Sequence, residues 1–141
     1  MKAKFDNAYM QMAIIWSKLS HCKRRKVGCL LVKDNMIISD GYNGMPSGMN
    51  NCCEYEFDAS RWEVLHAETN ALLKCAKNGI SCKGSTLYIT LSPCPDCSKL
   101  ILQSGIISVI YLEEYERKEG IELLKDNNIN IKKIDYGITL L

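Results

Sequence analysis

Residues 86–105 read TLYITLSPCPDCSKLILQSG and contain a complete strand–turn–helix unit. Residues 86–90 are rich in β-branched and aromatic side chains, which predicts a strand. Leu91-Ser92-Pro93 ends that strand, and Pro95 suits the first turn of a helix, where its missing N–H costs nothing. The helix is expected over residues 96–104, with Gly105 as its stop. A strand that leads directly into a helix is typical of an α/β fold.

The same kind of pattern continues on both sides of this unit. Helices are expected over residues 5–20, 62–78 and 116–127, and strands over residues 27–32, 36–41, 107–112 and 129–134. Asp6 or Asn7 is expected to cap the first helix, whose apolar stripe is Tyr9, Met12, Ala13, Trp16 and Leu19. A hairpin followed by β-α-β units predicts a three-layer α/β/α domain, with a mixed five-stranded sheet and helices on both faces. We expect residues 1–141 to form this single domain.

Composition limits the classes of protein to consider. The chain of 141 residues is 47% hydrophobic and 24% charged, with a net charge of +2, which indicates no nucleic-acid-binding surface. No segment approaches the roughly 18 apolar residues that a membrane span needs. The first 20 residues contain no apolar signal core. We therefore expect a soluble, cytoplasmic protein with neither a nucleic acid nor a membrane as partner.

Eight cysteines are the most unusual feature of the composition. Without a signal peptide, metal ligation or simple burial is favoured over disulfides. Cys29 and Cys75 have apolar neighbours and are expected in the core. Only Cys94 and Cys97 have the tight spacing of a zinc site.

His66, Cys94 and Cys97 form a sufficient protein ligand set for a catalytic zinc, with a fourth position left for water. The two cysteines are three residues apart, so both lie on one face at a helix N-terminus, where the helix dipole favours thiolate. His66 is expected in the first turns of the helix over residues 62–78, and Glu68 is placed to reach the water without binding the metal. A structural zinc module is the alternative, but it would need a fourth Cys or His, and His21 is the only other histidine.

Two further stretches carry polar groups near strand ends. His-Cys-Lys-Arg-Arg-Lys at residues 21–26 is the densest basic cluster and precedes the first strand. It is either a solvated loop or an anion site, for which Arg supplies bidentate geometry. Gly-Tyr-Asn-Gly-Met-Pro-Ser-Gly at residues 41–48 follows the second strand and is rich in turn residues.

These motifs together resemble the deoxycytidylate (dCMP) deaminases of the zinc-dependent cytidine deaminase-like superfamily. The resemblance rests on Arg-Arg-Lys-Val-Gly, the 41–48 loop, His-Ala-Glu, Ser-Pro-Cys-Pro-Asp-Cys and the strand ending at Tyr111. It implies hydrolysis of dCMP to dUMP and ammonia, which supplies dUMP for thymidylate synthesis, with zinc on the three ligands and Glu68 as proton shuttle. The nearest enzyme alternative is a tRNA adenosine deaminase, which shares both metal motifs but typically has Met in the spacer that is here Pro95-Asp96.

The resemblance also implies roles for residues outside the metal motifs. The backbone of Ala67 and Ser92 would contact the base, Asn43 the sugar hydroxyl, and Arg24 or Arg25 the 5′-phosphate, with Tyr111 lining the pocket. Family members are homo-oligomers, often hexamers, activated by dCTP and inhibited by dTTP with Mg²⁺. Candidate effector-site residues are Tyr42, Gly44 and Lys26. Some relatives carry a second zinc on histidines that precede His-Ala-Glu, but residues 49–65 contain none. Cys52-Cys53-Glu54 could partly replace them, and one catalytic Zn²⁺ is expected.

Overall fold

A computed structural model of the chain describes residues 2–135. Its elements follow the predicted order: α1 (Lys2–Ser17), β1 (Gly28–Lys33), β2 (Met36–Tyr42), the short 3₁₀ helix η1 (Glu56–Asp58), α2 (Ala67–Lys77), β3 (Thr86–Leu91), α3 (Pro95–Ser104), β4 (Ser108–Glu113), α4 (Glu119–Asp126) and β5 (Asn130–Lys133). Apart from the start of α2, the predicted helices and strands agree with these bounds to within three residues at each end.

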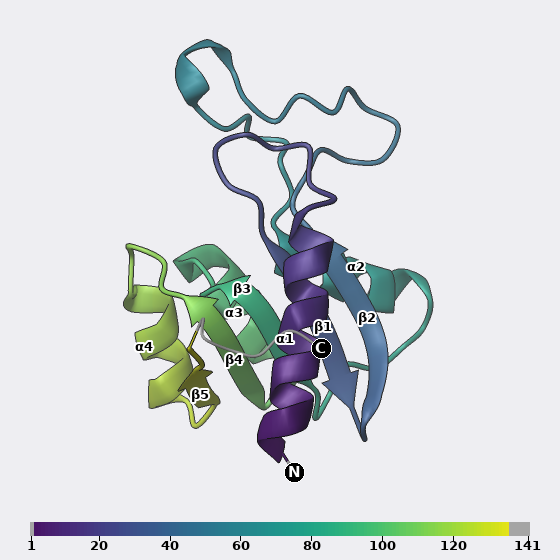
Figure 1. The fold of residues 1–141 in the computed structure, drawn as a ribbon, viewed down its shortest axis with the longest axis vertical. Coiled ribbons are helices and arrows are strands. Elements are labelled where there is room, and N and C mark those ends of the chain that lie inside the picture. Colours follow the sequence, from purple (N-terminus) through teal and green to yellow (C-terminus); the bar gives the residue numbers. More distant parts are fainter. Residues whose placement is uncertain (1, 136–141) are drawn as a thin grey trace.

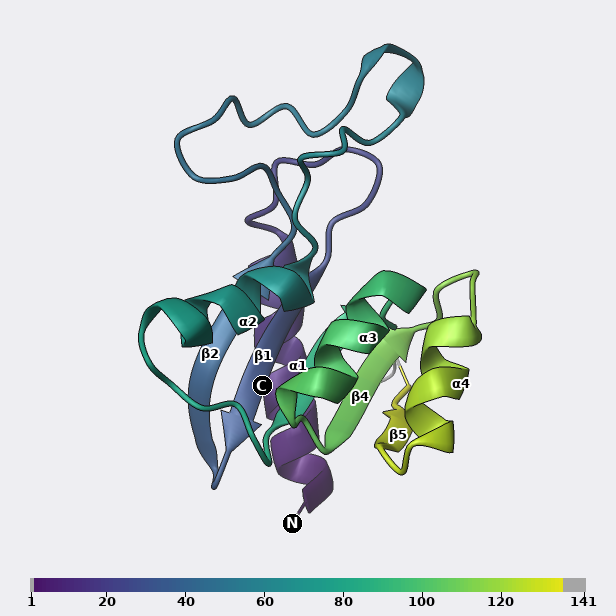
Figure 2. The same ribbon diagram turned by 180° about the vertical axis from the view of Figure 1, so that it is seen from behind.

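The five strands form one mixed sheet in the order β2-β1-β3-β4-β5. Strand β1 runs antiparallel to both β2 and β3, whereas β3, β4 and β5 are parallel to one another. Helix α1 crosses one face of the sheet (Figure 1), and α2 and α3 cover the opposite face (Figure 2). The predicted three-layer α/β/α architecture with a mixed five-stranded sheet is confirmed.

Side chains that alternate along the strands fill two cores, one on each face of the sheet. Leu30 and Val32 of β1 pack towards Met10 and Ala13 of α1. Their neighbours in the strand belong to the larger core under α2, α3 and α4, which contains Cys29, Leu31, Ala67, Ala71, Cys75, Leu87, Ile89, Ile101, Ile106, Val109, Tyr111, Ile121 and Leu124. Strands with both faces covered read as continuous apolar runs, which is why β1 and β4 were recognisable. Cys29 and Cys75 are buried, as predicted.

Helix α1 differs from its prediction at both ends. It begins at Lys2 and ends at Ser17, so Leu19 of the predicted stripe lies beyond it, half exposed. Asp6 is not a cap, because it lies inside the helix and is only 2% exposed. Its carboxylate accepts a hydrogen bond from the Tyr88 hydroxyl at 2.5 Å and pairs with Lys132 at 3.1 Å. A buried carboxylate whose partners are this distant in sequence has no local signature.

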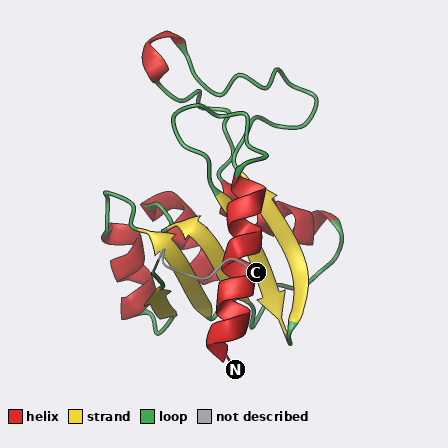
Figure 3. Ribbon diagram, viewed as in Figure 1, coloured by secondary structure: helices red, strands yellow, loops and turns green. Residues whose placement is uncertain are grey.

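Residues 44–65, here called the outer loop, project beyond one end of the sheet (Figures 1 and 3). Gly44 and Leu65 close the base of this loop by pairing their backbones, with N–H to carbonyl distances of 3.0 and 2.8 Å. The predicted helix start at Trp62 was therefore wrong, since residues 62–65 return from the outer loop and α2 begins only at Ala67. Trp62 is 83% exposed, as expected for a residue outside the core. Within residues 2–135, no helix is long and apolar enough to cross a membrane.

Candidate active site

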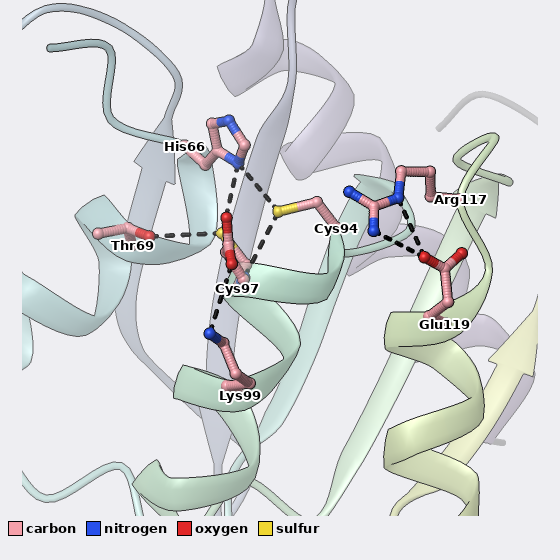
Figure 4. Close-up of polar contacts among 8 residues, drawn as sticks. His66, Thr69, Cys94, Cys97, Lys99, Arg117 and Glu119 are labelled. Carbon is pink, nitrogen blue, oxygen red and sulfur yellow. Dashed lines mark hydrogen bonds and ion pairs between the residues drawn. The ribbon is translucent and has the colours of Figure 1, made fainter. Parts of the chain in front are cut away.

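The ends of two helices bring His66, Cys94 and Cys97 together. His66 precedes α2 with an extended backbone (φ −73°, ψ 158°), one residue outside the helix in which it was predicted. Cys94 occupies the N-cap position of α3, and Cys97 lies in the first turn of that helix. His66 Nδ1 lies 3.4 Å from Cys94 Sγ and 3.3 Å from Cys97 Sγ (Figure 4).

This arrangement fits a zinc ion. Nitrogen and sulfur ligands about 2.0–2.3 Å from a tetrahedral zinc lie roughly 3.5 Å from one another. The three ligand atoms are all within 4.8 Å of one another, and no fourth Cys, His or carboxylate joins them in the described part of the chain. Three protein ligands and one open position are typical of a catalytic zinc site, whereas a structural zinc site would be closed.

The start of α3 favours a thiolate. The backbone N–H of Cys97 donates to Cys94 Sγ at 3.4 Å, and Pro95 occupies the first turn, as predicted. The hydrogen bond from the Cys97 thiol, with that from His66, lowers the pKa of Cys94 to about 4. The same contact with Cys94, together with burial, raises the pKa of Cys97, although the Thr69 hydroxyl at 3.5 Å opposes this rise. The surroundings of Cys94 therefore favour the thiolate form that zinc binds.

Glu68 is the buried carboxyl group of the site. It lies in the first turn of α2, is 4% exposed, and has its pKa raised to about 7, chiefly by desolvation. Its position depends on Gly41 of β2, where a Cβ atom would lie 2.2 Å from the carbonyl oxygen of Ala67. Only glycine permits this close crossing of strand and helix. A carboxyl group with a pKa near neutrality can both accept and return a proton.

A cavity of about 460 Å³ extends from the zinc-type cluster, which is His66, Cys94 and Cys97, to Arg24 and Arg25. Five of the predicted substrate-site residues line it, namely Asn43, Ala67, Ser92, Arg24 and Arg25, together with His66, Glu68 and Cys94. The remaining lining residues are Cys22, Val27, Glu54, Ser60, Val64, Leu91, Glu114, Tyr115 and Glu116. The candidate effector residues Tyr42, Gly44 and Lys26 do not line it.

Tyr111 does not line this cavity, contrary to the expectation. Its side chain is buried in the core beneath the helices, and its hydroxyl lies 3.4 Å from Glu114 Oε1. Tyr115 lines the cavity instead, and its backbone N–H donates to Ser92 Oγ at 2.6 Å. Tyr115 was not among the residues predicted from the sequence, although residues after a parallel strand's carboxyl end commonly form ligand sites.

Asn43 fastens the predicted basic cluster, residues 21–26, here called the basic loop. Its Oδ1 accepts from the Val27 N–H at 2.8 Å, and its Nδ2 donates to the Arg25 carbonyl at 2.7 Å. The Ser20 hydroxyl also donates to the Asn43 carbonyl oxygen at 2.8 Å. An amide nitrogen carries two hydrogens, so one remains for a ligand.

The arginines of the basic loop have different partners. Arg25 Nη2 pairs with Glu113 Oε2 at 3.0 Å, whereas Arg24 Nη1 donates to the uncharged Ser60 hydroxyl at 3.2 Å. Lys26 Nζ points away to the Ser20 carbonyl, at 2.5 Å. The positive charge of Arg24 is therefore the less neutralised of the two arginine charges at the cavity.

Cys22 and Cys53 form a disulfide, which corrects the expectation that the spare cysteines are simply buried or bind metal. Their Cα atoms lie 5.1 Å apart although 31 residues separate them in sequence. The contact forms because the outer loop returns over the basic loop, which no local spacing reveals. Glu54 adds its carboxylate to this pair, with ligand-type atoms within 4.8 Å of one another.

Comparison with known proteins agrees with the site. Residues 3–113 match the family model of the cytidine and deoxycytidylate deaminase zinc-binding region. A deoxycytidylate deaminase of Enterobacteria phage T4 is 34% identical over 90% of this chain and 92% of its own length. One of Mycobacterium phage D29 is 37% identical over 78% of this chain and 95% of its own length.

A solved structure is also similar. The crystal structure of dCMP deaminase from the cyanophage S-TIM5, in complex with dCMP and dUMP, superposes with a TM-score of 0.92. It is 47% identical in sequence and covers 95% of this chain and 99% of its own. With the ligand set, the fold and these relatives in agreement, the chain belongs to the deoxycytidylate deaminases of the zinc-dependent cytidine deaminase-like superfamily.

Proposed function

We propose that this protein hydrolyses dCMP to dUMP and ammonia. One observation carries the proposal: the buried Glu68 and the zinc-type cluster lie at one part of a cavity that Arg24 and Arg25 also line. Glu68 and the zinc-type cluster suit attack on a cytosine ring, and the two arginines suit a phosphate. Support also comes from the relatives named deoxycytidylate deaminase and from the similar structure that contains dCMP and dUMP.

His66, Cys94 and Cys97 would hold the zinc, which when bound supplies Lewis acidity that lowers the pKa of water towards about 7. The Glu68 carboxylate takes a proton from the attacking water and delivers it to the ring nitrogen next to the reacting carbon. The second proton of the water then goes, again through Glu68, to the departing amine. One carboxylate that accepts and returns protons can make both deliveries.

Other cavity residues would bind the parts of the nucleotide that do not react. The backbones of Ala67 and Ser92 lie next to Glu68 and Cys94 at the cavity wall and would orient the base. Asn43 would donate its remaining amide hydrogen to the sugar hydroxyl. Arg24 is the better candidate for the 5′-phosphate, because Arg25 is already paired with Glu113.

We also propose that dCTP activates and dTTP inhibits the enzyme, with Mg²⁺ accompanying the nucleotide, in a homo-oligomer that supplies dUMP for thymidylate synthesis. The family resemblance supports this regulation. The candidate effector residues Tyr42, Gly44 and Lys26 lie outside the cavity lining, so an effector there would not compete directly with dCMP. Their neighbour Asn43 holds the basic loop, which gives an effector a short physical route to the phosphate end.

An ammonia-release assay tests the proposal. Zinc-loaded protein is given dCMP, dCTP, deoxycytidine or CMP, each alone and with dCTP or dTTP plus Mg²⁺ as effector. We expect dCMP to have the highest kcat/KM and activity to disappear with the zinc after chelation. Turnover of adenosine in tRNA but not of dCMP would instead support the tRNA deaminase alternative.

A further inference from the structure

Glu54 is a buried carboxylate of the outer loop that the proposed reaction does not use. It is 8% exposed and lines the cavity near the basic loop. Its carboxylate oxygens accept the backbone N–H of Lys23 at 3.3 and 3.1 Å and that of Arg24 at 3.4 Å. Two consecutive amides of the basic loop are therefore bound to one side chain from the outer loop.

The guanidinium of Arg24 is held by the same part of the outer loop. Ser60, whose hydroxyl accepts from Arg24 Nη1 at 3.2 Å, is paired through its backbone with Glu54 in an isolated β-bridge. Flanking bonds of 2.7 Å, from Tyr55 N to Ala59 O and from Arg61 N to Cys53 O, close this bridge on both sides. Arg24 is thus contacted at two points, its amide by Glu54 and its guanidinium by Ser60.

A second set of contacts holds the end of the basic loop from the sheet. The side chain of Asn43 binds the Arg25 carbonyl and the Val27 N–H, as described above. The basic loop is consequently fixed between β2 and the outer loop, which lie at the same end of the sheet (Figure 1). A backbone fixed before ligand binding lowers the conformational entropy lost when an arginine closes on a phosphate.

We infer that Glu54 is a positioning residue for Arg24, which holds the basic loop in the conformation that binds the 5′-phosphate of the substrate. This inference rests on the proposed function, and it concerns substrate affinity only. Glu54 lies outside the cluster of His66, Cys94 and Cys97, so the chemical step does not depend on it. Its loss should weaken phosphate-dependent binding and leave the rate at saturation unchanged.

Steady-state kinetics of zinc-loaded Glu54→Ala and Glu54→Gln test this inference. We expect the KM for dCMP to rise roughly tenfold in Glu54→Ala, with kcat within about twofold of the parent, because the charge-assisted hydrogen bonds to both amides are lost. Glu54→Gln keeps one carbonyl oxygen, so its KM for dCMP should lie between those of the parent and Glu54→Ala. Glu56→Gln, an exposed carboxylate two residues further along, is the matched control and should behave as the parent.

A double-mutant cycle distinguishes positioning from general structural support. In an Arg24→Ala background, Glu54→Ala should have no further effect on KM, since its target is gone. Product inhibition gives a second readout: Glu54→Ala should weaken inhibition by dUMP and leave inhibition by deoxyuridine unchanged. Additive effects in the cycle, or equal weakening for dUMP and deoxyuridine, would overturn the inference.

Two further outcomes are decisive. If the parent deaminates dCMP and Glu54→Ala has the parental KM, the inference is wrong and the proposed function stands. If the parent does not deaminate dCMP, both are wrong. Zinc content is measured in parallel, so that the kinetics of each variant refer to fully loaded protein.

Discussion

The two ends of the cavity are built in different ways. The reacting end consists of His66, Glu68, Cys94 and Cys97, all at or next to the starts of α2 and α3, which lie on the sheet. The basic end consists of the basic loop and the part of the outer loop that holds it. Its residues belong to no helix or strand of the sheet, and side-chain contacts between distant segments fix them. On the proposed function, rigid elements carry the chemistry, whereas loops carry the substrate choice.

The largest expected effect is at the reacting end. Glu68→Gln should reduce kcat for dCMP by about 10³- to 10⁴-fold, because the variant cannot carry a proton between water, ring and amine. Zinc content and the unfolding temperature of the loaded protein should remain near the parental values. Glu122→Gln, an exposed carboxylate on α4, serves as control. Substantial turnover by Glu68→Gln would show that Glu68 is not the proton shuttle, whereas a structural zinc module predicts no turnover by either protein.

The same substitution should stabilise the zinc-free protein. The folded-state pKa of Glu68 is raised from 4.5 to about 7, so folding favours the protonated carboxyl. The stability that the protonated Glu68 carboxyl contributes is fully present below pH 4.5 and is lost as pH rises through about 7. A rise in the pKa from 4.5 to about 7 corresponds to about 3 kcal/mol. Urea unfolding of chelated protein should show Glu68→Gln to be more stable than the parent at pH 8.5 and equal to it at pH 4. A pH-independent difference would argue against this account.

Gly41 connects the reacting end to the sheet. Gly41→Ala should lower the free energy of unfolding by about 2–3 kcal/mol, because the new Cβ would overlap the Ala67 carbonyl oxygen at 2.2 Å. It should also reduce kcat, since α2 carries Glu68. Gly44→Ala is the matched control, as no atom lies within 4 Å of a Cβ built there. Denaturant unfolding and steady-state kinetics of both variants check this prediction. If Gly41→Ala were as stable as Gly44→Ala, β2 and α2 would have to move apart at little cost.

The smallest effect is expected at the basic end. Arg24→Ala should raise the KM for dCMP about tenfold with kcat little changed, as expected for one charge-assisted contact to the phosphate. Arg25→Ala should have the smaller effect, because Arg25 is already paired with Glu113. Deoxycytidine kinetics should be unaffected in both variants. The reverse ranking, or a similar loss with deoxycytidine, would mean that Arg24 does not bind the phosphate.

Several features of the molecule could be predicted from the sequence because their causes are local. Pro95 and Gly105 marked the two ends of α3, and the apolar runs of β1 and β4 marked strands covered on both faces. The cysteines of the zinc-type cluster could be predicted because the three-residue spacing places Cys94 and Cys97 on one helical face. His66 was joined to these two cysteines because a catalytic zinc needs a third protein ligand, and the family resemblance agrees with this set.

Other features depended on contacts between distant residues. Asp6 looks like a helix cap in sequence, but its buried pairing with Tyr88 and Lys132 places it inside α1. The return of the outer loop delayed the start of α2 to Ala67. Tyr111, expected at the pocket, faces the core because strand register decides which side of the sheet a residue occupies.

By itself, the sequence determined the α/β class, the strand order along the chain and the residues of the zinc-type cluster, since periodicity, helix ends and ligand type are local properties. Only the tertiary structure decided which groups meet at the basic end. The Cys22–Cys53 disulfide and the contacts of Glu54 and Asn43 each join segments that are distant in sequence. Such contacts form only once the sheet has brought the two loops to one end, so no local pattern encodes them.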